Sequence, residues 1–103
     1  MARRTVDGVI EAVRYAPDGK IALVRVYERR GPTFSDHILL DRQALLERLK
    51  SGQRFVTGRR RPLWGHTFEL GKPVRAIQRD GEEFITADGD HARGDDLADT
   101  PRF

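Results

Sequence analysis

Two short segments that combine aspartate with glycine set the strongest constraint on the fold. Pro17-Asp18-Gly19 and Asp80-Gly81 each lie between two runs in which apolar and polar residues alternate. Alternation with a period of two is typical of β-strands. Glycine adopts positive φ without a steric penalty, so an Asp-Gly pair between two such runs favours the tight turn of a β-hairpin. The sequence therefore predicts two hairpins, whose four strands cover residues 6–15, 21–28, 74–79 and 82–86.

One helix is predicted between the two hairpins, over residues 42–50. Asp41 is placed to cap it, because a carboxylate there accepts the unpaired N–H groups of the first turn. Leu40 before the cap and Leu45 within the helix form the pattern of a hydrophobic staple, and Gly52 is placed to end the helix. The apolar stripe that we expect to face the core consists of Leu45, Leu46 and Leu49.

The remaining strands are predicted over residues 33–40, 54–58 and 67–70, which gives the order β-β-β-α-β-β-β-(β). An open sheet of this size exposes long edges, so closure into a small barrel is favoured. We expect a mainly β protein with one short α-helix, folded as a small closed or partly open barrel in residues 1–87. The order of elements resembles that of the OB-fold, and an SH3-like barrel and a sheet with one packed helix are the alternatives.

Side chains on the inner faces of these elements form the predicted core. Residues two apart on a strand, or three to four apart on a helix, lie on the same face. On this basis the expected core consists of Val9, Val13, Ala22, Val24, Val26, Ile38, Leu40, Leu45, Leu49, Phe55, Phe68, Val74 and Ala76.

The composition favours a single soluble domain and excludes several classes of protein. With 103 residues the chain is about the size of one domain. The absence of cysteine excludes disulfide frameworks, thiolate zinc sites and cysteine nucleophiles. No apolar run approaches the length of a membrane span, and the first residues lack the apolar stretch of a signal peptide. We therefore expect a cytoplasmic protein with no membrane contact.

The net charge of +3 hides a strong asymmetry along the chain. Residues 1–79 carry 17 lysines and arginines against 8 acidic residues, whereas residues 80–103 carry 2 against 8. A basic body attracts phosphates or acidic surfaces, and an acidic segment competes for the same sites. Residues 88–103 contain few apolar side chains and are predicted to be an acidic, disordered tail. Its role is either to solubilise the protein or to compete weakly for the arginines at 59–61 through Asp90, Asp95, Asp96 and Asp99.

The sequence contains no constellation that would support catalysis or metal binding. His37, His66 and His91 have no histidine or cysteine partner at the spacing of a metal site. Neither a nucleophile elbow nor a glycine-rich phosphate loop is present. We therefore expect a protein that is not an enzyme, with no catalytic residue, no metal and no cofactor.

The segment from 59 to 66 is the strongest candidate for a binding site. Sites for single-stranded nucleic acid combine a charged track for the backbone with aromatic platforms for the bases. We therefore predict a non-enzymatic module that binds single-stranded nucleic acid or RNA through this basic and aromatic loop. The residues that we expect to make contact are Arg59, Arg60, Arg61, Trp64 and His66.

Further residues join this site if the turn after the second strand lies nearby. Arg29 and Arg30 would add charge there, and Tyr27 and Phe34 would add aromatic platforms. A structural interpretation stands beside the functional one, since Trp64 could close the core and the arginines could form a solvated loop. The rival function is a protein-interaction domain that binds an acidic or extended segment of a partner, and a small-ligand barrel is a third.

We expect Trp64→Ala to weaken the binding of single-stranded nucleic acid by roughly 1–3 kcal/mol, if bases stack on the indole ring. Oligonucleotide titrations followed by fluorescence anisotropy measure this loss, and thermal melts of the same variant are the control. Unfolding of the variant would place Trp64 in the core and exclude it as a stacking platform.

Overall fold

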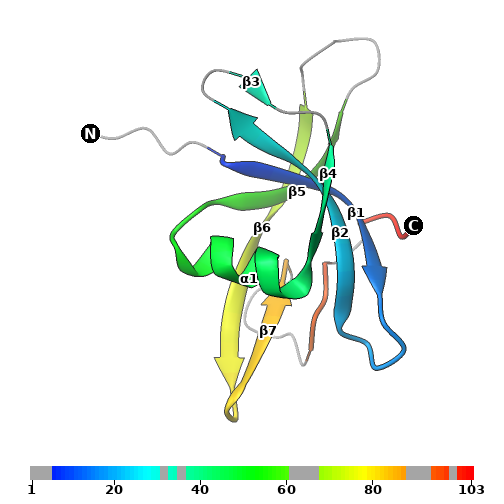
Figure 1. Cartoon of the computed structure of the whole chain (residues 1–103), viewed down its shortest axis with the longest axis vertical. Helices are drawn as coiled ribbons and strands as arrows, with labels where there is room; N and C mark the ends of the chain where they lie inside the picture. The colour runs from blue at the N-terminus through cyan, green and yellow to red at the C-terminus, as the bar shows by residue number, and fades with distance from the viewer. Residues whose placement is uncertain (1–5, 31–32, 35–36, 61–67, 88–93, 98–99) are drawn as a thin grey trace.

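The computed structural model describes residues 6–30, 33–34, 37–60, 68–87, 94–97 and 100–103 (Figure 1). In this part of the chain, strands precede and follow a single helix. The strands are β1 (Gly8–Tyr15), β2 (Ile21–Arg30), β3 (Thr33–Phe34), β4 (Ile38–Asp41), β5 (Phe55–Arg60), β6 (Phe68–Arg79) and β7 (Glu82–Thr86), and the helix is α1 (Arg42–Lys50).

All seven strands belong to one sheet, in the order β3-β2-β1-β5-β6-β7, with β4 also paired to β2. Most neighbouring strands are antiparallel, but β1 and β5 run parallel, with Gly8 beside Phe55 and Ile10 beside Thr57. The strands before and after α1, β4 and β5, lie on opposite sides of the β1–β2 hairpin. The helix therefore crosses over this hairpin, and it lies in front of the sheet in Figure 1.

The mainly β fold with one short helix is confirmed, whereas closure into a barrel is not. Within the described residues, no pairing joins the two ends of the sheet, β3 and β7, so the sheet is open. The parallel β1–β5 pair lies in a sheet whose other named strand pairs are antiparallel. No helix in the ranges given above is long and apolar enough to cross a membrane.

The two predicted hairpins are confirmed. β1 and β2 pair around the turn at 17–19, where Gly19 has a φ of 87°. β6 and β7 pair around Asp80 and Gly81, whose φ angles of 53° and 82° have the two positive signs of a type I′ turn. Two consecutive residues with positive φ explain why an Asp-Gly pair occupies this turn.

The helix also begins and ends where the sequence predicts. Asp41 Oδ1 accepts a hydrogen bond of 2.8 Å from the Ala44 N–H, which caps the first turn. Gly52, two residues past the helix, has a φ of 95°, a conformation that glycine adopts without strain. Leu45 and Leu46 are buried in the core cluster, so the apolar stripe fixes the helix to the sheet.

Several strand boundaries differ from the predicted ones. The strand predicted over 33–40 is represented by two pieces, β3 and β4, which pair with different parts of β2. β2 and β5 each run two residues further than predicted, so that the arginine pairs at 29–30 and 59–60 lie in strands and not in loops. Hydrogen bonding to a neighbouring strand, β3 for the first pair and β6 for the second, extends these strands beyond their apolar residues.

The strands predicted over 67–70 and 74–79 form one long strand, β6, which continues through Pro73. Proline has no N–H to donate to a ladder, so it is tolerated in a sheet at an irregularity. The β5–β6 register shifts after Val56, and there the Lys72 N–H donates to Thr57 Oγ1 at 2.9 Å. The prediction of two separate strands is therefore wrong, because a bulge accommodates Pro73 within one strand.

The core lies between the sheet and the helix. The predicted core residues that are buried are Val9, Val13, Val24, Val26, Leu40, Leu45, Phe55 and Val74. Those that are half-buried are Ala22, Ile38, Leu49 and Ala76, and the Phe68 side chain lies outside the described part of the structure. Both faces of β1 are buried, so Ile10 and Ala12 join the core although the pattern did not assign them to it. Further buried residues that the pattern did not assign to the core are Ile21, Tyr27, Ile85, Ala87 and Leu97.

Residues 94–97 are part of this fold. Leu97 has no exposed surface and belongs to the core cluster. The Asp96 N–H donates to Ile85 O at 2.9 Å, and the Asp96 carbonyl accepts from the Ala87 N–H at 2.8 Å, so this segment pairs along β7. The sequence predicts an acidic, disordered tail from residue 88 on, and the described residues 94–97 and 100–103 differ from that expectation. The core thus extends past the expected boundary at residue 87.

Asp95 anchors this segment through a carboxylate with no exposed surface. Its Oδ2 accepts from the Ile21 N–H at 2.8 Å and from Arg42 Nε at 2.7 Å. Its Oδ1 accepts from the Ile85 N–H at 3.0 Å and from Arg42 Nη2 at 3.2 Å. Arg42 Nη2 also donates to the Glu83 carbonyl at 2.6 Å. One carboxylate therefore ties together the start of β2, the start of α1 and β7.

The ion pair between Asp95 and Arg42 shifts the pKa values of both groups. Burial raises the pKa of Asp95, but the hydrogen bonds from Arg42, Ile21 and Ile85 outweigh it and hold the pKa below its ordinary value. The hydrogen bond to Asp95 raises the pKa of Arg42, against the effect of burial. From the sequence we expect Asp95 to associate with the arginines at 59–61, whereas its partner in the structure is Arg42.

We expect Asp41→Ala to lower the free energy of unfolding by about 1 kcal/mol, because the Ala44 N–H loses its acceptor. Leu45→Ala should cost more, roughly 2–5 kcal/mol, because this side chain is fully buried. Urea denaturation of the two variants measures both losses. Equal and negligible losses would show that the cap and the packed face of α1 are misassigned.

We expect Asp95→Asn to destabilise the protein by roughly 3 kcal/mol, because the amide removes the charge opposite Arg42 and leaves one acceptor oxygen in place of two. Asp96→Asn is the matched control, since Asp96 is the exposed neighbour in the same segment. Its loss should be far smaller in the same urea denaturation experiment.

The effect of Asp95→Asn should also depend on pH. A carboxylate whose pKa is lowered by folding stabilises the protein above its ordinary pKa and loses this contribution as the pH falls through the folded value. The stability difference between the wild type and Asp95→Asn should therefore shrink below about pH 4. A difference that stays constant into strongly acidic solution would contradict the ion pair.

Candidate functional site

The edge of β1 that faces β5 is shared between two segments. β5 pairs with β1 only as far as Ile10. Beyond this point the C-terminal segment (residues 100–103) takes the place of β5. The Val13 N–H donates to Pro101 O at 2.8 Å, and the Phe103 N–H donates to Val13 O at 3.1 Å. Both segments run parallel to β1, and a notch remains where one ends and the other begins.

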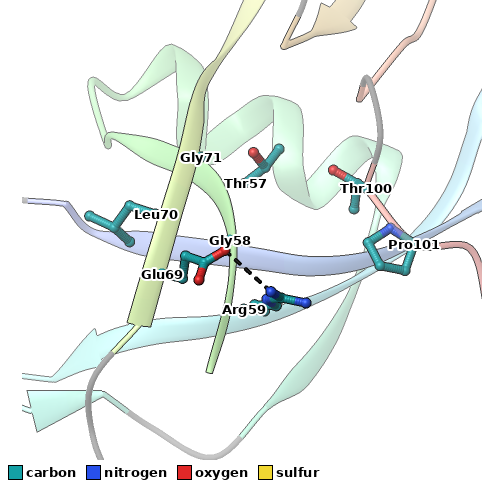
Figure 2. A pocket seen from close by; sticks show the side chains of 8 residues that line it. All are labelled: Thr57, Gly58, Arg59, Glu69, Leu70, Gly71, Thr100 and Pro101. Atoms are coloured by element: carbon teal, nitrogen blue, oxygen red, sulfur yellow. Dashed lines mark ion pairs between the residues drawn. The ribbon is translucent and has the colours of Figure 1, made fainter. Parts of the chain in front are cut away.

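The notch encloses a cavity of about 330 Å³. Figure 2 shows β5 and β6 on one side of it and the C-terminal segment on the other, with β1 passing behind. Its volume is at the lower end of the range for small-molecule sites. The lining residues are Thr57, Gly58, Arg59, Glu69, Leu70, Gly71, Thr100 and Pro101.

Two glycines bring β5 and β6 close together at the cavity. A Cβ atom on Gly58 would lie 2.7 Å from Glu69 O, and one on Gly71 would lie 2.5 Å from Thr57 Oγ1. Thr57 is buried, and its hydroxyl oxygen accepts from the Lys72 N–H at 2.9 Å. This wall of the notch is therefore close-packed backbone, which holds its shape.

Charged and apolar side chains form the rim of the notch on this side. Arg59 Nη2 lies 3.4 Å from Glu69 Oε1, and the two side chains are 71% and 51% exposed (Figure 2). Exposed ion pairs of this kind contribute little stability, so Arg59 exchanges Glu69 for another anion at small cost. Leu70 beside them is 53% exposed, which gives the rim an apolar contact surface.

An arginine–aromatic stack lies two residues beyond Pro101, which lines the other side of the notch. The Cζ atoms of Arg14 and Arg25 each lie 4.7 Å from the centre of the Phe103 ring, within the range of a cation–π interaction. Arg14 Nε also donates to the Phe103 main-chain oxygen at 3.0 Å. Arg25 has a second partner, since its Nη1 lies 3.5 Å from Glu11 Oε1. We call this group the Arg14–Phe103–Arg25 stack.

A second arginine–aromatic contact lies on the opposite face of the C-terminal segment. Arg102 Cζ lies 4.9 Å from the centre of the Tyr15 ring. Successive side chains of an extended segment point to opposite faces, so Arg102 and Phe103 face opposite ways. The Tyr15 hydroxyl accepts a hydrogen bond of 3.0 Å from the Leu97 N–H, which links this contact to the core.

The structure describes only part of the predicted basic loop. Arg59 lies at the notch, and the backbone of Arg60 pairs with Phe68 at the end of β5. The remaining predicted contacts, Arg61, Trp64 and His66, lie outside the described residues, as do the side chains of Arg30, Phe34 and Arg60.

Arg29 does not join Arg59. The Arg29 N–H donates to Asp7 O at 2.7 Å and its Nε donates to Val6 O at 2.7 Å, so it lies beside the chain just before β1. Arg59 lies further along β5 than the residue that pairs with Ile10. The two arginines are therefore separated along β1, and Arg29 ties β2 to the residues before β1.

Tyr27 and His37, two other residues considered from the sequence, contact each other within the fold. Tyr27, considered as an extra platform, is buried, and its hydroxyl donates to Glu11 Oε2 at 3.0 Å. His37 meets the Tyr27 ring edge-on, with 6.0 Å between ring centres. Among the residues that the structure describes, no group of three or more histidine, aspartate or glutamate side chains is arranged to hold a metal ion.

No family model matches the sequence, and no curated protein or solved structure is significantly similar to it. The arrangement of side chains at the notch therefore carries the functional argument.

Only the hairpin that carries the two arginines has a signal in the sequence. In the β1–β2 hairpin Ala12 pairs with Arg25 and Arg14 pairs with Leu23, so the two arginines are diagonal neighbours on one face. The register shift between Arg14 and Tyr15 that produces this pairing does not follow from the predicted turn at 17–19. Phe103 has no such signal, because it joins Arg14 and Arg25 only through contacts between residues far apart in the sequence.

Proposed function

We propose that this protein is a non-enzymatic module that binds single-stranded nucleic acid or RNA across the notch and the Arg14–Phe103–Arg25 stack. One observation carries the proposal: Arg59 lines one side of a shaped notch, and Pro101 on the other side leads within two residues to Phe103, whose ring lies against Arg14 and Arg25. Positive charge that follows a backbone, with flat surfaces that stack bases, is the combination that single-strand sites use.

The chemistry of the side chains supports this assignment. A guanidinium binds phosphate oxygens with two parallel hydrogen bonds, and its plane also stacks on bases. Arg14 and Arg59 are exposed, so each is accessible to a phosphate. The ring and the hydrogen bond to Phe103 hold Arg14 in place, which reduces the entropy that it loses on binding.

The predicted basic loop belongs to the proposed site as well. Arg60 and Arg61 follow Arg59 directly in the chain, and Trp64 and His66 come shortly after them. We include these residues in the proposed site. Arg29 is assigned to the fold, and Arg30, which follows it in β2 and pairs with β3, is left out because it lies at the same end of the sheet. We also propose that the protein is cytoplasmic. An acidic or extended protein segment is the alternative ligand.

The finer fold class is part of the proposal as well. Bulges bend a sheet and increase its twist, and irregular register occurs in both the β1–β2 and the β5–β6 pairs. These bends support a partly open barrel, OB-like or SH3-like, with the notch at the point where β1 changes its neighbour.

Salt dependence of oligonucleotide binding tests the proposal. Fluorescence anisotropy with a short mixed-sequence RNA should show affinity that falls with salt, by about 0.7 log units per log unit of salt for each phosphate neutralised. Arg59→Gln should lower this slope by about 0.7 if Arg59 contacts one phosphate. Arg14→Gln should lower the slope and also weaken binding at high salt, because a stacking surface is lost.

Arg54→Gln is the matched control. Arg54 is also an exposed arginine, but its main chain lies beside Asp7, at the other end of β1 from the stack. This variant should keep the slope and the affinity of the wild type. Equal effects of Arg54→Gln and Arg59→Gln would show that the RNA is attracted by the overall charge and not bound at the notch. The absence of binding at low salt would refute the proposal.

A further inference from the structure

We infer that the edge of β1 at Val13 is a docking groove for an extended protein segment. Residues 101–103 of this chain, which we call the resident segment, occupy this groove and can be displaced from it. The partner that fits is a segment of the same chemistry, with an aromatic residue two positions after the residue whose carbonyl binds the Val13 N–H. This inference does not depend on nucleic-acid binding.

The main-chain contacts are those of strand addition to a sheet edge. The resident segment makes one hydrogen bond to the Val13 N–H and one to the Val13 carbonyl, at 2.8 and 3.1 Å, in parallel orientation. Recognition by strand addition draws affinity from such bonds, and any extended backbone can make them. Pro101 lacks an N–H, which shows that the first position of the segment needs to supply only a carbonyl.

Selectivity comes from the side chain that follows. The Phe103 ring lies against two guanidinium groups, those of Arg14 and Arg25, and Arg14 also binds the main-chain oxygen of the same residue. An aromatic ring gains from both cations, whereas an aliphatic or small side chain does not. The groove therefore selects an aromatic residue at this position.

The resident segment can leave without loss of the core. Asp95 and Leu97 anchor the preceding residues independently, through the buried ion pair and the core cluster. Pro101 and Arg102 are exposed, and the described contacts of residues 101–103 are with β1 and with Arg25 of β2. The notch beside Pro101 holds about 330 Å³ of open space, which gives a longer partner segment room to continue.

Peptide binding to the full-length Phe103→Ala variant tests this inference. The probe is a fluorescein-labelled peptide with the sequence of residues 98–103, Ala-Asp-Thr-Pro-Arg-Phe. Because the variant's own segment competes less well, the probe should bind the variant roughly tenfold more tightly than the wild type. The same peptide with alanine in place of phenylalanine is the matched control and should bind neither protein.

A double variant and an NMR measurement complete the test. Adding Arg25→Gln to Phe103→Ala should remove most of the gain, while thermal melts verify that both variants are folded. In the wild type, excess probe should shift the Val13 amide resonance.

Equal affinity of the probe for wild type and Phe103→Ala, or equal binding of the alanine peptide, would overturn the inference. RNA titrations of the same samples keep the two proposals apart, since peptide exchange without RNA binding would refute only the proposed function.

Discussion

The buried carboxylate of Asp95 is the contact on which the arrangement of the chain depends. It accepts hydrogen bonds from the first residue of β2, the first residue of α1 and a residue of β7, so it joins elements that no single strand pairing connects. A buried carboxylate is costly unless charge and hydrogen bonds compensate it, and here Arg42 and two main-chain N–H groups do so. Removal of Asp95 takes this acceptor from Arg42 and from both main-chain N–H groups, and removal of Arg42 leaves the buried carboxylate without its opposite charge.

The anchor at Asp95 also creates the candidate site. Leu97 follows it into the core, and the chain then reaches the edge of β1 that β5 has left. Had β5 stayed paired along the whole of β1, residues 100–103 would have had no edge to join. The notch, the Arg14–Phe103–Arg25 stack and the docking groove therefore follow from one geometric fact: β1 changes its neighbour after Ile10.

Features that depend on nearby residues were predictable from the sequence, and features that depend on distant ones were not. The helix cap at Asp41 and the turn at Asp80-Gly81 each need only a few neighbouring residues, and both are confirmed. The role of Asp95 needs partners 74 and 53 residues away, Ile21 and Arg42, so composition alone suggested disorder. Of the predicted site, Arg59 lies at the notch, while the stack was missed because Phe103 joins it across the fold.

The most direct test of the claim that residues 94–97 and 100–103 belong to the folded structure is native-state hydrogen exchange, measured by NMR. The N–H groups of Ile21 and Ile85 donate to Asp95, and that of Val13 donates to Pro101. These amides are protected only if both segments are in place. The account predicts protection at Ile21 and Ile85 that approaches that of the amides shared between β1 and β2, and weaker but measurable protection at Val13, whose acceptor lies in the exchangeable segment. Rapid exchange at Ile21, Ile85 and Val13, with the β1–β2 amides still protected, would contradict it.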